Sequence, residues 1–232
     1  MDKSDFITWA KKLAANYQPN DALKSELQNI EFIAIVGPTG AGKTTLIDKL
    51  GITKVLSDVS RAPRPGEKDK RDYFFRTDFA EILSDIKQGL YAQFLIAEFD
   101  EFYGTRRKSY PEKDRAIMAV RADQIETFRS LGFGSFHQLF VMPPGYIEWM
   151  HRIGSGNNGD SFNKRLEEAK ISLHAALQDD RYSLILNDTI ERALSDIKLA
   201  LQGNTIPQER AELARQTAGY LLEKLGAADD LF

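Results

Sequence analysis

The sequence contains no cysteine, so disulfide bonds, thiolate nucleophiles and cysteine-based zinc sites are excluded. It also lacks an excess of charge of either sign: 31 lysines and arginines stand against 34 aspartates and glutamates, for a net charge of −3. A broad basic surface is therefore not expected, nor is a nucleic-acid partner. No apolar run is long enough to span a membrane, and residues 1–5 lack the apolar core of a signal peptide. From these absences we expect a cytoplasmic protein with no membrane partner.

The remaining composition is that of a globular protein. Apolar residues make up 42% and charged residues 28% of the 232 positions, enough for one substantial α/β domain or two small ones. Short β-branched runs alternate with amphipathic stretches, which predicts a mostly parallel sheet with helices on both faces, a three-layer α/β fold. The predicted strands are 31–36, 54–57, 93–99, 116–121, 136–142 and 182–187, and the predicted helices are 43–50, 78–88, 122–131, 144–152, 161–178 and 189–202.

Residues 37–45, read as GPTGAGKTT, fit the phosphate-binding loop pattern G-x-x-x-x-G-K-[ST]. In such a loop the backbone N–H groups surround phosphate oxygens, Lys43 supplies a charge to the β- and γ-phosphates, and the Thr44 hydroxyl can hold Mg²⁺. A chance glycine-rich turn is the alternative, but an apolar strand at 32–36 precedes the loop and a helix that stops at Gly51 follows it. We therefore predict a P-loop fold that binds ATP and Mg²⁺. The loop residues predicted to bind ATP are Gly37, Thr39, Gly40, Ala41, Gly42, Lys43, Thr44 and Thr45.

A second group of residues fits the binding of another phosphate. Arg61 and Arg64 lie three residues apart in a proline-restrained loop, so that they can grip one phosphate from two sides. Tyrosine hydroxyls, such as those of Tyr73 and Tyr103, can complete the grip without adding charge. Taken alone, the two arginines would be read as a solvated loop.

Their surroundings favour the functional interpretation. Residues 57–67, 72–75 and 103–105 fit the motif S-x-x-x-R-x-P-R-x-G-E, followed by D-Y-x-F and Y-G-[ST]. This combination resembles guanylate kinase, the P-loop enzyme that transfers the γ-phosphoryl group of ATP to GMP. The resemblance runs from about residue 31 to residue 202. Its first motif is shared by all P-loop proteins, whereas the second is quite specific to this family.

The resemblance implies a role for each matching residue. Arg61, Arg64, Tyr73 and Tyr103 would bind the acceptor monophosphate, and Ser57 and Thr105 would offer hydroxyls to the edge of its base. Arg165 would reach the transferring phosphoryl group, together with Lys43 and Arg152, and Asn187 would lie near the donor adenine.

The sequence departs from the family at the positions that read the base and at the lid. Ile96 falls where the family has a guanine-reading Glu, although Glu98 could be displaced into that role. Arg121 replaces a second guanine-reading carboxylate, and a guanidinium has only donors where guanine needs acceptors. Arg121 is interpreted either as a substrate contact or as an ion-pair partner of Glu98 or Asp100. In the lid, Ser155 stands where a second phosphate-facing Arg is expected, which leaves Arg152, with Arg106 or Arg107 as possible substitutes.

These observations predict three parts of the chain. Residues 1–30 form an N-terminal helical extension, 31–203 a guanylate kinase-like domain with an acceptor-binding segment at 57–105 and a lid at 153–160, and 204–232 a C-terminal helical extension. Ser4 is the predicted N-cap of the first helix, and Pro207 opens the last one. The extensions are interpreted as packing appendages, with homo-oligomer formation through them left open.

Three functions remain at this stage. The leading hypothesis is transfer of the γ-phosphoryl group from ATP to a nucleoside monophosphate, GMP to GDP. The second keeps this chemistry but changes the acceptor, for instance to ribose 1,5-bisphosphate. The third is an inactive guanylate kinase-like binding module; the intact Gly42, Lys43 and Thr44 favour a working enzyme over it.

Overall fold

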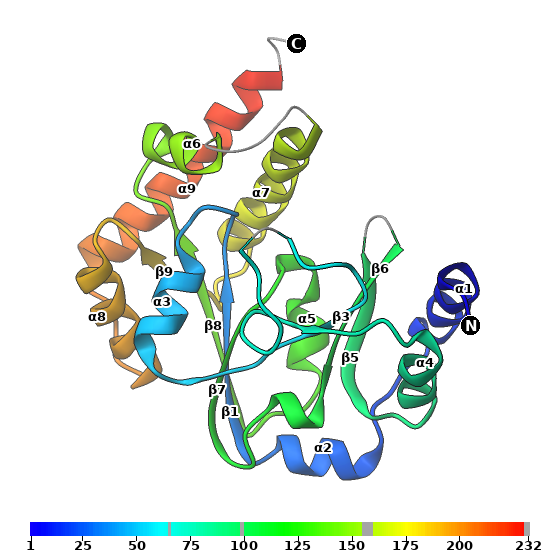
Figure 1. Cartoon of the computed structure of the whole chain (residues 1–232). Helices are drawn as coiled ribbons and strands as arrows, with labels where there is room; N and C mark the ends of the chain where they lie inside the picture. Colours follow the sequence, from blue (N-terminus) through cyan, green and yellow to red (C-terminus); the bar gives the residue numbers. More distant parts are fainter. Residues whose placement is uncertain (65, 98–99, 155–159, 230–232) are drawn as a thin grey trace. The chain divides into compact units, whose positions relative to one another are not determined.

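The computed structural model describes residues 1–64, 66–97, 100–154 and 160–229 (Figure 1). Its contacts divide the chain into two compact units. Unit 1 comprises residues 1–32, 53–118 and 126–136, and unit 2 comprises residues 33–52, 119–125 and 137–232. Unit 1 thus holds the N-terminal helices together with the whole predicted acceptor-binding segment, and unit 2 holds the phosphate loop. The domain boundaries expected from the sequence stay a prediction.

The larger sheet has five strands in the order β2-β7-β1-β8-β9. The pairs β2–β7 and β8–β9 are parallel. The strands are β1 (Ile30–Val36), β2 (Thr53–Lys54), β7 (Asp114–Ala119), β8 (Ser135–Met142) and β9 (Ser183–Leu186). β1 is buried almost throughout, as its continuous apolar sequence predicts for a central parallel strand. The predicted α/β fold with a mostly parallel sheet is confirmed.

The second sheet has four strands, in the order β4-β3-β6-β5, and belongs to unit 1. These strands are β3 (Asp58–Val59), β4 (Phe74–Phe75), β5 (Tyr91–Ala97) and β6 (Glu101–Arg106). The strand predicted at 93–99 lies in this sheet as β5, within the predicted acceptor-binding segment, and it runs antiparallel to β6. β3 and β4 were missed because two residues are too few to show a strand period.

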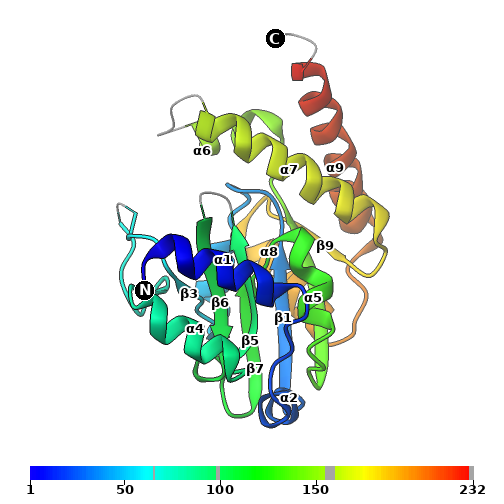
Figure 2. The same ribbon diagram turned by 90° about the vertical axis from the view of Figure 1, so that its right-hand side faces the viewer.

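Two helices of unit 1, α1 (Lys3–Ala14) and α4 (Phe79–Lys87), pack on one face of this second sheet. Unit 1 also holds α2 (Asp21–Leu27) and nearly all of α5 (Ile125–Arg129). Phe6 of α1 and Ile82 of α4 are buried with Phe94 and Phe102 of the sheet in one apolar cluster, and Figure 2 shows α1 and α4 side by side over β5. The cap of α1 is Asp2 rather than Ser4, since the Asp2 carboxylate accepts from the backbone N–H of Asp5 at 2.8 Å.

The helices of unit 2 are α3 (Lys43–Leu50), α6 (Tyr146–Gly154), α7 (Asp160–Gln178), α8 (Ile190–Leu201) and α9 (Gln208–Asp229). Among them, α3 follows the phosphate loop, and α8 and α9 pack against β9. α8 packs beside α3, and α9 packs along α7 and against β9 (Figures 1 and 2). The predicted helix 122–131 is shorter than expected, because 122–124 form a 3₁₀ turn before α5.

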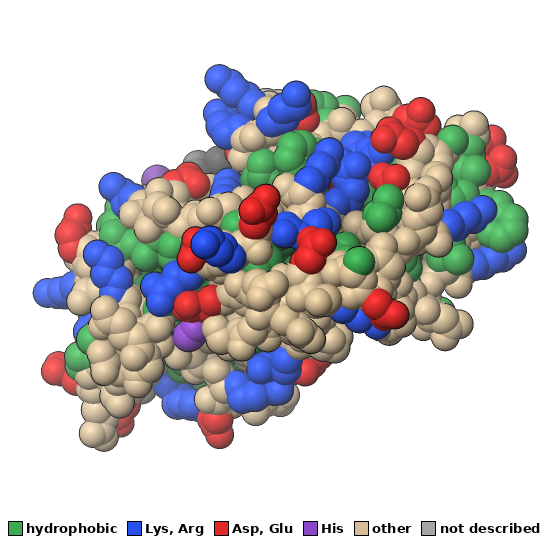
Figure 3. Space-filling model, turned by 90° about the horizontal axis from the view of Figure 1, so that it is seen from below, with side chains coloured by type: hydrophobic (Ala, Val, Ile, Leu, Met, Phe, Trp, Pro, Cys, Tyr) green, Lys and Arg blue, Asp and Glu red, His purple; other side chains and the backbone are tan. Residues whose placement is uncertain are grey.

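Charge is distributed over the surface without a concentration of one sign on the face drawn in Figure 3, where basic and acidic side chains are interspersed. In the described part of the chain, no helix combines the length and the apolarity that crossing a bilayer requires.

Candidate functional site

The phosphate loop of unit 2 has a backbone that only glycine accepts at key positions. Gly37 and Gly42 have φ angles of 142° and 94°. A Cβ atom would lie 2.3 Å from the Val141 carbonyl oxygen at Gly37 and 2.3 Å from Asn187 Nδ2 at Gly42. The loop then leads into α3, whose first residue is Lys43. The predicted succession of strand, loop and helix N-terminus is therefore present, with the backbone N–H groups of the first helical turn and the positive end of the helix dipole at the same place.

Lys43 lies under this loop and is partly buried. Its Nζ donates to the carbonyl oxygens of Gly37 at 2.6 Å and Pro38 at 2.9 Å. Desolvation lowers the pKa of Lys43 to about 8, against an opposing effect of the Glu168 carboxylate. An ammonium group in this position can exchange loop carbonyls for phosphate oxygens at little cost in reorganisation.

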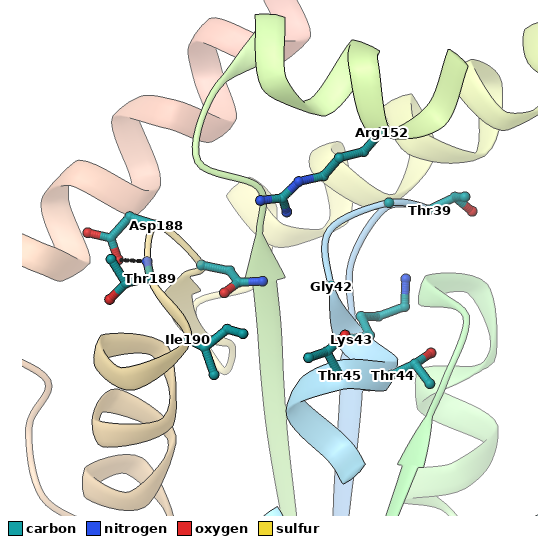
Figure 4. Close-up of a pocket in the computed structure, with 11 residues that line it drawn as sticks. Thr39, Gly42, Lys43, Thr44, Thr45, Arg152, Asp188, Thr189 and Ile190 are labelled. Carbon is teal, nitrogen blue, oxygen red and sulfur yellow. Dashed lines mark hydrogen bonds between the residues drawn. The ribbon is translucent and has the colours of Figure 1, made fainter. Parts of the chain in front are cut away.

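A cavity of about 560 Å³ opens beside the loop, within unit 2. Figure 4 shows the Arg152 side chain extending from α6 into it, opposite the turn that joins β9 to α8. Arg152 also pairs with Glu148 one helical turn away. Among the described residues, Arg152 lines this cavity and Arg165, on α7, does not. The lining comprises Thr39, Gly40, Gly42, Lys43, Thr44, Thr45, Arg152, Asn187, Asp188, Thr189 and Ile190.

The side chains of Asn187 and Trp149 donate hydrogen bonds to carbonyl oxygens of the phosphate loop. The Asn187 amide donates to the Ala41 carbonyl at 2.7 Å, and the Trp149 indole N–H donates to the Thr39 carbonyl at 2.7 Å. Sequence reasoning had placed Asn187 near the adenine and had missed Trp149. The signal for Trp149 was its position on the apolar face of α6, but that pattern predicts burial and not a contact with a distant loop.

The acceptor-binding segment lies in unit 1, where the structure brings together three of its predicted residues. Arg61 donates to both Glu67 carboxylate oxygens at 2.7 and 2.8 Å and to the Tyr103 hydroxyl at 3.0 Å. Its guanidinium also lies 5.1 Å from the centre of the Tyr73 ring. The hydrogen bonds that Arg61 donates to Glu67 raise the pKa of Arg61, so this cation stays charged at every accessible pH.

Arg64 differs from Arg61 in its surroundings. Its backbone N–H donates to Glu67 at 2.8 Å, while its side chain is exposed. Glu67 therefore fixes the loop by accepting from the Arg61 side chain and the Arg64 backbone at once. The Arg64 side chain itself stays available at the surface of the loop.

The register of the β5–β6 hairpin decides which side chains share a face with Tyr103. Leu95 lies opposite Tyr103, and Gln93 lies opposite Thr105. Because side chains alternate along a strand, Ile96 lies on the other face, where it packs against the apolar cluster. Ile96, which falls where the family has a guanine-reading Glu, is thus partly buried against that cluster.

Gln93 is the polar residue that sequence reasoning missed on this face. It is buried, its Nε2 donates weakly to Thr105 Oγ1 at 3.4 Å, and its Oε1 has no hydrogen-bond partner among the described residues. A buried acceptor left without a donor is costly, so the position of this oxygen calls for an explanation. The Thr105 hydroxyl is fully buried and lies 2.7 Å from the Tyr110 hydroxyl, whereas Ser57 is buried at the start of β3. The signal in the sequence was a glutamine in an otherwise apolar strand.

Arg121 forms ion pairs with two acidic side chains that were not among the partners expected from the sequence. It pairs with Asp123 at 3.0 Å and with Glu168 of α7 at 2.8 Å. Asp100 instead pairs with Lys11 at 2.7 Å. Glu98 lies outside the described residues, as do Ser155 and most of the predicted lid at 153–160.

In the described part of the chain no group of three or more His, Asp or Glu side chains could enclose a metal ion. Mg²⁺ that arrives with a nucleotide needs few protein ligands, since the phosphates and water supply most of its six oxygens. The exposed Thr44 hydroxyl at the cavity suits this arrangement.

Comparison with known proteins agrees with this architecture. The family model for guanylate kinase matches residues 29–204. A guanylate kinase from Prochlorococcus marinus is 33% identical over 180 residues, which cover 72% of this chain and 94% of the relative. One from Nostoc sp. is 32% identical over 191 residues (75% and 90%), and one from Yersinia pestis 30% over 215 residues (82% and 95%).

The fold has a solved counterpart. The crystal structure of guanylate kinase from Anaplasma phagocytophilum aligns with a TM-score of 0.55 and 22% identity, over 82% of this chain and 95% of that one. The P-loop fold and the family predicted from the motifs are thereby confirmed. With a family model that covers well over half of its length, the chain belongs to the guanylate kinase family of nucleoside monophosphate kinases.

Proposed function

We propose that this chain transfers the γ-phosphoryl group of ATP to GMP, producing ADP and GDP. The observation that carries the proposal is the side-chain cluster of the acceptor segment, in which Arg61 is held by Glu67 and Tyr103 beside the Tyr73 ring. A preorganised guanidinium with tyrosine hydroxyls suits the monophosphate end of an acceptor. The guanylate kinases to which the chain is similar support GMP as that acceptor.

The donor would bind in the cavity of unit 2. The phosphate-loop residues, from Gly37 to Thr45, would surround the polyphosphate, with Lys43 exchanging its loop carbonyls for phosphate oxygens. Asn187 would lie near the adenine, and the Thr44 hydroxyl would hold Mg²⁺, which supplies positive charge to the phosphates when it is bound. These assignments rest on the lining of the cavity and on the resemblance of the motifs.

The acceptor would be held by its phosphate through Arg61, Arg64, Tyr73 and Tyr103. Ser57 and Thr105 are buried, so any contact of their hydroxyls with the base needs a local opening of this face. Gln93 offers a further acceptor oxygen there, suited to the N1–H or 2-amino donors of guanine. Arg121 had favoured ribose bisphosphate as the acceptor, but its ion pairs with Asp123 and Glu168 give this residue a structural role instead.

The reaction needs little covalent help from the protein. An oxygen of the acceptor phosphate attacks the γ-phosphorus in line, and the bond from that phosphorus to the β,γ-bridging oxygen breaks. The attacking oxygen is already ionised, so no general base is required. Lys43, Arg152 and Arg165 would stabilise the charge on the equatorial oxygens in the transition state, the main source of catalysis in phosphoryl transfer.

A coupled assay of ADP release tests the proposal, with GMP, dGMP, the other common monophosphates and ribose 1,5-bisphosphate as acceptors. We expect the highest kcat/KM with GMP. A higher value with ribose 1,5-bisphosphate would assign the second hypothesis instead. Tight Mg·ATP binding with no turnover on any acceptor would show an inactive binding module.

A further inference from the structure

Helix α9 begins at Gln208, beyond the residues 29–204 that the family model matches. It was expected to be a packing appendage. Most of its buried residues are small or apolar and face α7 and β9, as that expectation requires. Its first turn, however, carries Arg210, whose contacts are of another kind.

All three nitrogens of the Arg210 guanidinium donate hydrogen bonds to neighbouring residues of unit 2. Nε donates to Asp196 of α8 at 2.6 Å, and Nη1 and Nη2 lie 3.2 Å from the two carboxylate oxygens of Asp188. Nη2 also donates to the Leu186 carbonyl at 3.0 Å. One side chain thus joins α9, α8 and the end of β9. Only the planar fork of arginine can make this set of bonds.

The segment that Arg210 holds belongs to the donor cavity. Asp188 lines that cavity, and the preceding Asn187 donates to the Ala41 carbonyl of the phosphate loop. Burial of Asp188 opposes its ionisation, but donors from Arg210, Arg192 and the Thr189 N–H lower its pKa to about 2. Arg192 is well exposed, so its ion pair adds little. Arg210 is therefore the main side chain that fixes this wall of the cavity from behind.

We propose that Arg210 is a positioning residue of the donor site, and that the C-terminal helix is a working part of ATP binding in this chain. Arg210 is not among the residues that line the cavity. It acts through Asp188 and the Leu186 carbonyl, which hold Asn187 in place against Ala41. The inference rests on the proposed function only in taking the cavity as the ATP site.

The experiment compares Mg·ATP binding, measured by calorimetry without acceptor, in the parent chain and in Arg210→Ala and Arg210→Lys. The matched control is Arg215→Ala, on the same helix, which removes an exposed ion pair with Asp180 at 3.1 Å. We expect Kd for ATP to rise on the order of tenfold in Arg210→Ala, since charge-assisted bonds are lost. Arg210→Lys should recover only part of this loss, and the control should bind as the parent does.

Steady-state kinetics separate positioning from general destabilisation. We expect KM for ATP to rise while KM for the acceptor and kcat stay within about threefold of the parent. Thermal melting of each variant checks that the protein is folded at the assay temperature. If the folded Arg210→Ala or Arg210→Lys protein bound ATP as tightly as the parent, the inference would be overturned. Failure of the parent chain itself to bind ATP would instead overturn the proposed function.

Discussion

The proposed donor loop in unit 2 and the proposed acceptor face in unit 1, each of which would bind a phosphate, are built from different parts of the chain. The donor loop in unit 2 is made of backbone: glycines with positive φ create the cradle, and Lys43 adds one charge. The acceptor face in unit 1 is made of side chains: Arg61 is fixed by Glu67 and Tyr103, which come from different strands and loops. A single added Cβ atom should therefore disrupt phosphate binding by the backbone loop, whereas each substitution in the side-chain cluster should remove only one contact.

Removal of the donor lysine should have the largest effect. We expect Lys43→Ala to lower kcat/KM by on the order of 10³-fold or more, because in the proposed mechanism its ammonium stabilises the charge on the transferring phosphoryl group. Lys49→Ala, at the exposed end of the same helix, should leave turnover unchanged. Normal turnover in the Lys43 variant would contradict the donor assignment.

A pair of glycine variants tests whether the loop binds by its backbone. Gly42→Ala places a methyl group 2.3 Å from Asn187 Nδ2, so Asn187 must leave the Ala41 carbonyl. We expect ATP affinity to fall by on the order of 10²-fold. Gly51 also has a positive φ, of 65°, but a Cβ atom there meets nothing within 4 Å.

The control separates strain from loss of the site. Gly51→Ala should cost about 1 kcal/mol of folding stability, the cost of a left-handed alanine, and leave ATP binding unchanged. Equal losses of affinity in the two variants would mean that strain in α3, rather than the shape of the cradle, decides binding.

The same contrast explains what the sequence could predict. The phosphate loop is contiguous, and the positive φ angles of Gly37 and Gly42 are a local requirement, so the loop and the helix that follows it lie where the sequence predicts them. The acceptor face depends on the hairpin register, which no single segment determines. Comparison with the family motif therefore put Ile96 in the slot of the guanine-reading Glu, with Glu98 as a displaced alternative, and it overlooked Gln93 on the other face of the hairpin.

Ion pairs were harder still to predict, because they depend on which helices meet. The expected partners of Arg121 included Asp100, which pairs with Lys11 of α1 in unit 1, while Arg121 pairs with Glu168 in unit 2. Arg210 could not be connected with the donor cavity at all, since 22 residues separate it from Asp188. Such contacts are properties of packing and not of sequence spacing.

Arg64 and Arg61 allow a finer test of the acceptor face. Arg64→Ala removes an exposed side chain, so we expect KM for the acceptor to rise by about tenfold to a hundredfold with no change in melting temperature. Arg61→Ala should raise the same KM and also lower the melting temperature, because it leaves Glu67 half-buried without its main partner. ATP affinity should stay constant in both. An unchanged acceptor KM for Arg64→Ala would mean that Arg64 does not bind the acceptor phosphate, which would leave Arg61, Tyr73 and Tyr103 as its proposed ligands.

The two regions should also differ in their response to pH. The pKa of Lys43 is lowered to about 8, so above this pH the free protein loses the charge that attracts ATP. Bound polyphosphate favours the protonated form, and affinity for ATP should therefore fall by up to about tenfold per pH unit between pH 8 and the higher pKa of the complex. The acceptor KM should stay flat over the same range, since the pKa of Arg61 is raised and its guanidinium stays charged.

This loss of ATP affinity cannot be attributed to unfolding caused by the same group. The pKa of Lys43 is lowered from 10.5 on folding, so between pH 8 and 10.5 the unfolded chain binds more protons than the folded one. The contribution of Lys43 to the free energy of unfolding therefore rises with pH in the window where ATP binding weakens. Calorimetric titrations of ATP across this range, with Lys43→Ala as the control, check the assignment. A fall of the same size in that variant would place the titrating group elsewhere.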